Sequence, residues 1–139
     1  MKTCLVVANQ TLPGVPLADT VRERIAVGEC TFHVVVPLTP VPHGAVWEEG
    51  ESTEAARGRL AAFLGVLRNQ GVEAEGEIGD RDPIQAVRDV LRTKAVDEII
   101  LSTLPVGTSK WLAQNMVRRL KRSTGLPVTH VIAEVPAVL

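Results

Sequence analysis

The stretch TCLVVA at residues 3–8 is almost continuously apolar and rich in β-branched side chains. A strand with one face in water alternates apolar and polar residues, whereas a strand covered on both faces does not need to. Residues 31–36 (TFHVVV) and 98–101 (EIIL) have the same character. These three runs therefore predict central strands of a parallel sheet that has helices on both faces.

A weaker run at residues 72–78 and a last run at 128–135 bring the predicted strands to five. Between the runs, apolar side chains recur at the helical spacing of three or four residues. This pattern predicts four helices, at 17–25, 56–67, 84–91 and 109–124. Strands that alternate with helices through short connections predict a right-handed, three-layer α/β sandwich. We expect a single domain over residues 1–139 with a five-stranded parallel sheet.

The ends of the predicted helices carry local signals. Gly28 follows the first helix, and we expect it to end that helix in a left-handed conformation. Asp82 and Pro83 suit the N-cap and the first position of the third helix, and Gln85 can complete a capping box. Asp80 is a usual turn residue. We therefore interpret the two aspartates as structural and not as a metal or acid–base site.

Composition excludes several classes of protein. The net charge of −1 predicts no general affinity for nucleic acid or acidic membranes, and 3% aromatic residues are too few for a base-stacking platform. No apolar run is long enough to cross a bilayer, and the N-terminus does not resemble a signal peptide, so we expect a cytoplasmic protein. The two cysteines match no metal or redox spacing and are interpreted as buried, reduced thiols.

In an open parallel sheet, ligands bind beyond the carboxyl ends of the strands, where the strand order reverses. Asn9, Gln10 and Thr11 follow the first strand, and residues 102–109 follow the fourth. A long loop at residues 37–50 lies at the same end. Such a loop could be a functional lid or an exposed insertion.

The segment STLPVGTSK, at residues 102–110, leads into the fourth helix and contains four hydroxyl groups and one glycine. Free backbone N–H groups and the positive end of the helix dipole favour a phosphate there, with Lys110 as an added cation. The alternative is that Thr108 or Ser109 simply caps the helix. One glycine is too few for a Walker-type loop or a dinucleotide fingerprint. The predicted nucleotide- or phosphate-binding residues are Asn9, Thr11, Ser102, Thr103, Gly107, Thr108 and Ser109.

No catalytic or metal-binding residues are predicted. His43 is placed in the long loop, but no Ser or Cys nucleophile with an orienting acid accompanies it in the sequence. The fourth helix carries Lys110 and four cations within residues 118–122, with no acidic residue. These cations could contact a phosphate or an acidic partner, and we interpret them as a solvated helix face.

Five segments, taken in order, form one recognisable pattern. They are LVVANQT (5–11), FHVVVP (32–37), GD with PIQAV (79–87), DEIILST (97–103) and LPV (126–128). In this order they resemble the universal stress protein family over almost the whole chain. The resemblance implies a parallel sheet in the order 3-2-1-4-5, a homodimer, and ATP or another nucleotide as the ligand of some members.

The chain departs from the glycine pattern of the ATP-binding members. Those members have an Asp-Gly-Ser-like turn after the first strand and G-x2-G-x9-G-[S/T] after the fourth. Here Asn9 stands in place of the Asp, Ser102 and Pro105 stand at the first two glycine positions, and the third falls near Asn115. Side-chain bulk and a fixed proline dihedral oppose the close approach of backbone to phosphate. We therefore expect weak affinity for ATP.

Three functions are compatible with the sequence. The first is a stress-response-like regulatory module that binds a nucleotide or a phosphorylated small molecule where the first and fourth strands diverge. The second is a nucleotide-hydrolysing or transferring enzyme on the same fold, and the third is a ligand-free dimerisation module. The last strand, at 127–135, is apolar and lacks Lys and Arg. As an edge strand it would leave backbone groups unpaired, so we predict a homodimer through it.

Overall fold

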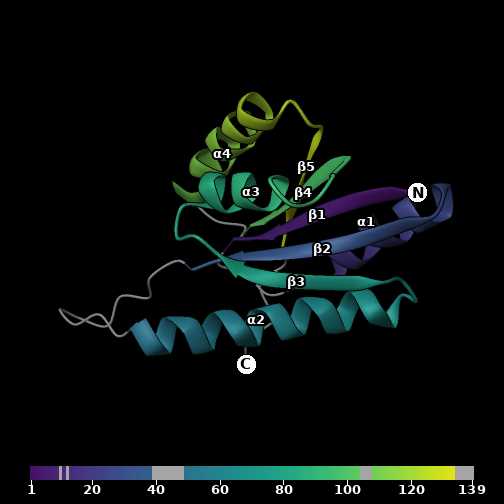
Figure 1. The fold of residues 1–139 in the computed structure, drawn as a ribbon, viewed down its shortest axis with the longest axis horizontal. Coiled ribbons are helices and arrows are strands. Elements are labelled where there is room, and N and C mark those ends of the chain that lie inside the picture. The colour runs from purple at the N-terminus through teal and green to yellow at the C-terminus, as the bar shows by residue number, and fades with distance from the viewer. Residues whose placement is uncertain (10, 12, 39–48, 104–107, 134–139) are drawn as a thin grey trace.

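Five parallel strands in the order β3-β2-β1-β4-β5 form the central sheet (Figure 1). The computed structural model describes residues 1–9, 11, 13–38, 49–103 and 108–133, and gives side chains for all of these except 49–52 and 108–113. The elements are β1 (Lys2–Ala8), α1 (Val15–Val27), β2 (Cys30–Pro37), α2 (Glu49–Asn69), β3 (Ala74–Gly79), α3 (Pro83–Leu91), β4 (Glu98–Thr103), α4 (Thr108–Thr124) and β5 (Val128–Ile132). The predicted fold class and strand order are confirmed.

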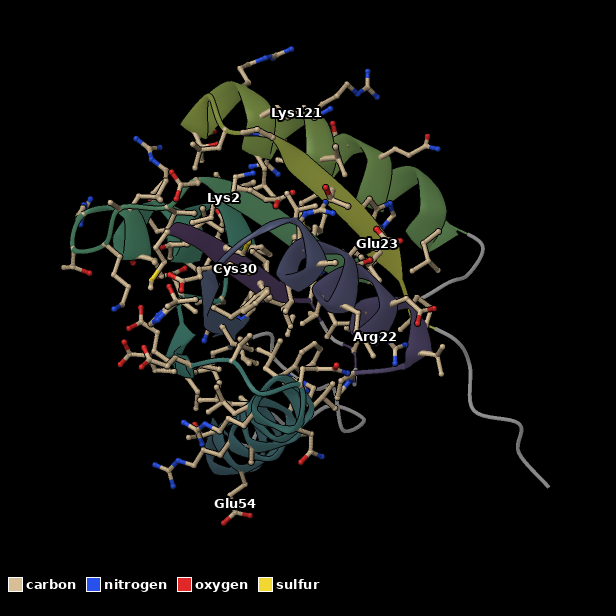
Figure 2. All side chains as sticks on the ribbon, turned by 90° about the vertical axis from the view of Figure 1, so that its right-hand side faces the viewer. Lys2, Arg22, Glu23, Cys30, Glu54 and Lys121 are labelled. Atoms are coloured by element: carbon tan, nitrogen blue, oxygen red, sulfur yellow. The ribbon has the colours of Figure 1, made fainter. Side chains whose placement is uncertain are left out.

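Both faces of the sheet are covered, which explains the nearly continuous apolar runs. Along β1, Cys4, Val6 and Ala8 belong to the hydrophobic cluster beneath α1 and α2, whereas Leu5 and Val7 belong to the cluster beneath α3 and α4. All five side chains are fully buried. Figure 2 shows the two helix layers on opposite sides of the sheet, with α2 on one side and α4 on the other.

The boundaries of some elements differ from the predicted ones. β4 continues to Thr103, two residues beyond the predicted end, and every residue in it is buried. α2 begins at Glu49 and so takes in the end of the predicted loop, whose residues 39–48 lie outside the described residues. β5 ends at Ile132, before the predicted end at Val135.

Glycines follow three of the helices, in two different conformations. Gly71 and Gly125 have φ angles of 83° and 70°, in the left-handed region that favours glycine. Gly28, after α1, has a φ of 172° and is extended, and its N–H donates to the carbonyl of Arg24. The prediction of a left-handed stop at Gly28 is therefore wrong. The chain passes almost directly into β2, which begins at Cys30.

Asp82 caps α3 as predicted, because its Oδ1 accepts from the backbone N–H of Ile84 at 3.0 Å. The predicted capping box does not form, since Gln85 Nε2 donates to Asp89 Oδ1 at 2.8 Å, one turn further along the helix. The backbone N–H of Asp82 donates instead to Asp80 Oδ1 at 2.9 Å. Both aspartates therefore serve the turn and the helix start, as interpreted from the sequence.

Candidate functional site

The carboxyl ends of β1 and β4 lie side by side at the point where the strand order reverses. From β1 the chain continues into α1 on one face of the sheet, and from β4 into α4 on the other. Ala8 pairs with Ser102, and the backbone N–H of Asn9 donates to the Ser102 carbonyl at 3.0 Å. The structure thus brings Asn9 and Ser102 together at the edge where ligands bind in open α/β sheets.

The hydroxyl of Ser102 is buried without a partner. The residue is 1% exposed, and its Oγ forms no hydrogen bond within the part of the chain that the structure describes. Its neighbours in register, Ala8 and Val131, belong to the hydrophobic cluster that also contains Leu17 from the first turn of α1. The Ser102 side chain therefore lies on the face of the sheet that α1 covers.

Thr103 lies on the opposite face, because successive side chains of a strand alternate. Its Oγ1 is 2.6 Å from Nε2 of His130 on β5, and the residue is 3% exposed. Burial lowers the pKa of His130, so the ring is neutral near pH 7 and can share this hydrogen bond in either direction. The hydroxyls of Ser102 and Thr103, which were predicted to bind one ligand together, therefore lie on different faces of the sheet. The Thr103 hydroxyl already has a partner in His130.

The start of α1 is a feature of this edge that the sequence interpretation missed. Gly14 is the N-cap and has no side chain to cap the first turn, and the first turn contains no acidic residue. The first backbone N–H groups of a helix carry partial positive charge and attract anions when no side chain caps them. The available signal was Gly-Val-Pro at residues 14–16, where a capped helix would have Ser, Thr, Asp or Asn.

The remaining predicted residues are placed as follows. Thr11 is buried and Asn9 is partly buried. Thr108 is the first residue of α4, one position before the predicted start, but its side chain and that of Ser109 are outside the description. Gly107 lies outside the described residues.

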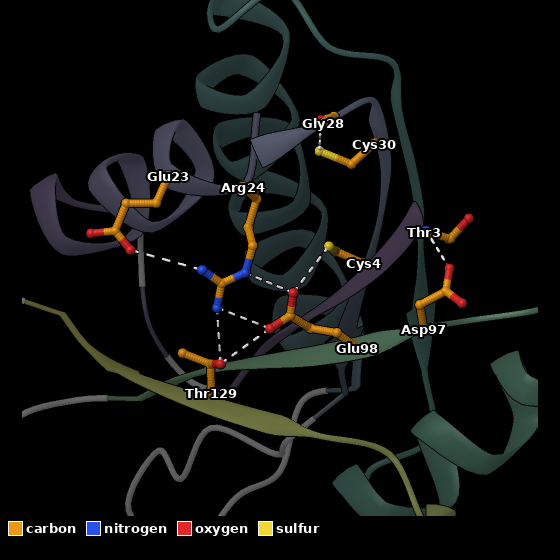
Figure 3. Close-up of polar contacts among 9 residues, drawn as sticks. All are labelled: Thr3, Cys4, Glu23, Arg24, Gly28, Cys30, Asp97, Glu98 and Thr129. Atoms are coloured by element: carbon orange, nitrogen blue, oxygen red, sulfur yellow. Dashed lines mark hydrogen bonds and ion pairs between the residues drawn. The ribbon is translucent and has the colours of Figure 1, made fainter. Parts of the chain in front are cut away.

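The amino edge of the sheet carries a partly buried ion pair (Figure 3). Arg24 of α1 donates from Nε and Nη2 to the two carboxylate oxygens of Glu98 on β4, at 2.7 and 2.9 Å. Thr129 Oγ1 donates to the same carboxylate at 3.2 Å and accepts from Arg24 at 3.1 Å. The hydrogen bonds from Arg24 are the main cause that lowers the pKa of Glu98. A glutamate inside a buried strand requires such partners, but the sequence does not say which residues supply them.

A pocket of about 350 Å³ lies beside this ion pair, with Cys4, Cys30, Arg24 and Asp97 among its lining residues. Both cysteines are free thiols; Cys4 is buried, whereas Cys30 is only half-buried. Burial, followed by the negative charge of Glu98, raises the pKa of Cys4 to about 12, and burial also raises the pKa of Cys30. Thiols with raised pKa values are poor nucleophiles, so we interpret this pocket as part of the structural edge of the sheet and not as a reactive cysteine site.

Histidines and acidic groups form no metal centre in the described ranges: no three or more His, Cys, Asp or Glu side chains converge there. His33 is 5% exposed within β2, and its Nε2 lies 3.7 Å from a carboxylate oxygen of Glu77. Burial is the main cause that lowers the pKa of His33. The same ranges contain no helix with the length and apolar character that a membrane span requires.

Comparison with solved structures identifies a similar fold. A universal stress protein from Archaeoglobus fulgidus matches with a TM-score of 0.61 and 16% sequence identity, over 92% of this chain and 93% of that chain. The fold is that of a universal stress protein. No protein-family model and no curated protein matches the chain. At this identity the likeness shows the fold alone, and the function is inferred from the site.

Proposed function

We propose that this protein is a regulatory module of the universal stress protein fold that binds a small phosphorylated ligand, of which a nucleotide is one class. The proposed site lies at the carboxyl edge of β1 and β4, on the face covered by α1. The observation that carries the proposal is the hydroxyl of Ser102, which is buried and has no hydrogen-bond partner among the described residues. The cytoplasm, expected from the sequence, is the proposed setting.

The start of α1 supports an anionic ligand. Leu17, in the first turn of α1, belongs to the same hydrophobic cluster as Ala8 and Val131, and the N-cap residue Gly14 has no side chain that could cap that turn. A phosphate placed there would interact with the positive end of the helix dipole. Ser102 could donate its hydroxyl hydrogen to the same anion, which would remove the cost of leaving that group unpaired. We therefore propose Ser102 and the α1 start as the phosphate contacts.

Binding without hydrolysis is the proposed mode. Hydrolysis of a nucleotide needs a positioned base or metal ligands beside the phosphate. Thr103, the nearest other hydroxyl in sequence, is directed to the other face, where it contacts His130. We therefore favour a binding module over the alternative, a nucleotide-hydrolysing or transferring enzyme on the same fold.

Isothermal titration calorimetry tests the proposal with ATP, AMP, cyclic AMP and inorganic phosphate. We expect at least one of the phosphorylated ligands to bind, with weak affinity for ATP, and Ser102→Ala to weaken that binding about tenfold through loss of one hydrogen bond to a charged group. Absence of heat from all four ligands would favour the ligand-free module. Mg²⁺-dependent phosphate release that is lost in Ser102→Ala would favour the enzyme.

We also propose that the module is a homodimer joined through β5. This strand is an edge of the sheet, and Ile132 within it is 42% exposed. The opposite edge, β3, carries Glu75 and Glu77, and charged residues of this kind protect edges from pairing. β5 has no Lys or Arg between Val128 and Ile132. Pairing two copies of β5 in a closed two-fold contact would satisfy the exposed backbone groups.

Light scattering at tens of micromolar protein tests the dimer. Ile132→Lys should give a folded monomer, because the side chain is exposed in a single chain and its replacement leaves the core intact. Val27→Lys is the matched control, since Val27 is exposed but lies on α1, and it should remain dimeric. A monomeric wild type, or a dimeric Ile132→Lys, would contradict the proposed interface.

A further inference from the structure

The C-terminal half of α4 presents a group of cations that have no partners among the described residues. They are Arg118, Arg119, Lys121 and Arg122, which we call the α4 basic face. All four side chains are exposed, and none forms an ion pair or hydrogen bond within the described part of the chain. Figure 2 shows long, nitrogen-tipped side chains of α4 projecting away from the sheet.

Helix stability does not explain this group. Arg118 and Arg122 are four residues apart, and Arg118–Lys121 and Arg119–Arg122 are three apart, so like charges are neighbours on the helix surface. Such pairs destabilise a helix. The helix dipole favours cations in the last turn, which accounts for Lys121 and Arg122 but not for the two arginines before them.

The packing of α4 directs these residues outward. Leu120 is fully buried in the cluster beneath α3 and α4, and Met116 and Val117 pack against the same cluster. Arg118 and Arg122 therefore lie near the middle of the solvent side of the helix, with Lys121 and Arg119 flanking them. At a rise of about 1.5 Å per residue, the basic face extends roughly 6 Å along the helix.

We propose that the α4 basic face binds a short acidic segment of a partner protein. Two or three carboxylates within about one helical turn, or within about three extended residues, would match its length. The interaction is independent of the proposed ligand site, because α4 starts at the carboxyl edge of the sheet and runs back toward the amino edge, where β5 begins.

A short acidic segment fits this surface better than nucleic acid or a membrane does. Residues 114–124 contain no aromatic side chain on which a base could stack. The exposed large apolar side chains are Met1, Val15, Val27 and Ile132, so among described residues none lies on α4 to enter a bilayer. The rest of the chain has 11 basic residues against 16 acidic ones. That negative balance would repel a long polyanion that extends over the rest of the surface. A short acidic segment would remain on the α4 basic face and would not approach the acidic residues elsewhere.

Fluorescence anisotropy with a labelled peptide of six glutamates between glycines provides the test. Arg118→Gln with Arg122→Gln should weaken binding about tenfold, because two unpaired cations are lost. Arg57→Gln with Arg81→Gln is the matched control. Both of these arginines are exposed, Arg57 on α2 and Arg81 after β3, and the change in net charge is the same. The control should bind within about twofold of the wild type, and raising the salt should weaken all binding.

Three outcomes would overturn the proposal. The first is no binding of the peptide by the wild type at 50 mM salt, and the second is equal weakening in the two double variants. The third is tighter binding, through the same two arginines, of a single-stranded DNA of equal charge or of vesicles containing phosphatidylserine. Circular dichroism of both double variants should match the wild type, because all four substituted side chains are exposed.

Discussion

Replacing Ser102 with Ala should stabilise the protein in the absence of ligand. The serine is 1% exposed, and its hydroxyl has no hydrogen-bond partner in the described part of the chain. Its neighbours in register, Ala8 and Val131, offer only apolar side chains. The folded state therefore carries the cost of removing this hydroxyl from water, and the substitution removes that cost.

The magnitude follows from two opposing effects. A buried polar group without a partner costs about 1–3 kcal/mol. Removing one oxygen atom leaves a void of roughly 10–15 Å³, which costs about 0.3 kcal/mol at the usual penalty per unit volume. We therefore expect Ser102→Ala to increase the free energy of unfolding by about 1 kcal/mol, which for a chain of this length raises the Tm by about 3 °C.

Urea unfolding followed by circular dichroism measures this change, with Thr103→Val as the matched control. The control removes the adjacent hydroxyl, which contacts His130 Nε2 at 2.6 Å, and leaves the imidazole unpaired. It should lower the free energy of unfolding by about 1–2 kcal/mol, so the two variants should change stability in opposite directions. A loss of stability in Ser102→Ala would mean that the hydroxyl already has a partner, and the reasoning behind the ligand site would fail.

Four further predictions concern the rest of the fold. Arg24→Met should lower the free energy of unfolding by about 3 kcal/mol, because it leaves the Glu98 carboxylate, which is 8% exposed, without its charged partner. In the wild type, Glu98 has a lowered folded pKa, so the stability that it contributes should be lost as the pH falls below 4.5. Urea unfolding measured as a function of pH tests this loss. Asp82→Ala should cost about 1 kcal/mol through loss of the α3 cap, by the same assay. Thiol titration should give two equivalents in the unfolded, unreduced protein, and in the native protein Cys30 should react before Cys4, whose pKa is raised to about 12.

The fold could be predicted because its strongest signals are local. A strand covered on both faces needs apolar residues at successive positions, and residues 3–8 and 31–36 show this without knowledge of any contact. The same holds for the Asp82 cap, which depends on residues next to it in the chain. Gly28 shows the limit of such signals. Glycine permits both left-handed and extended backbone, and the direct passage into β2 selects the extended form.

Contacts between distant residues could not be predicted. Arg24 and Glu98 are 74 positions apart, and nothing in the residues next to either one names the other as its partner. The run EIIL shows that a charged residue enters a buried strand, but finding its partner requires the packing of α1 against the sheet. The start of α1 was not predicted for a related reason, since only the fold shows that this helix, with glycine as its N-cap, begins at the same edge of the sheet as Ser102.

The separation of Ser102 and Thr103 follows from the length of β4. The sequence predicts that this strand ends at Leu101 and that the next hydroxyls belong to one loop that could enclose a phosphate. Because β4 continues to Thr103, adjacent side chains alternate between faces, and the face of α1 receives only the first hydroxyl.

Ser102 also stands where the resemblance to universal stress proteins would place a glycine. A glycine allows a ligand to approach the backbone, whereas a serine fills that space and adds a hydrogen-bond donor. Among the apolar neighbours of this position the added hydroxyl lowers stability unless a ligand accepts from it. In the proposed ligand site, one side-chain donor and the start of α1 would take the place of a glycine-rich loop. A module built in this way should favour compact anions over the extended triphosphate of ATP.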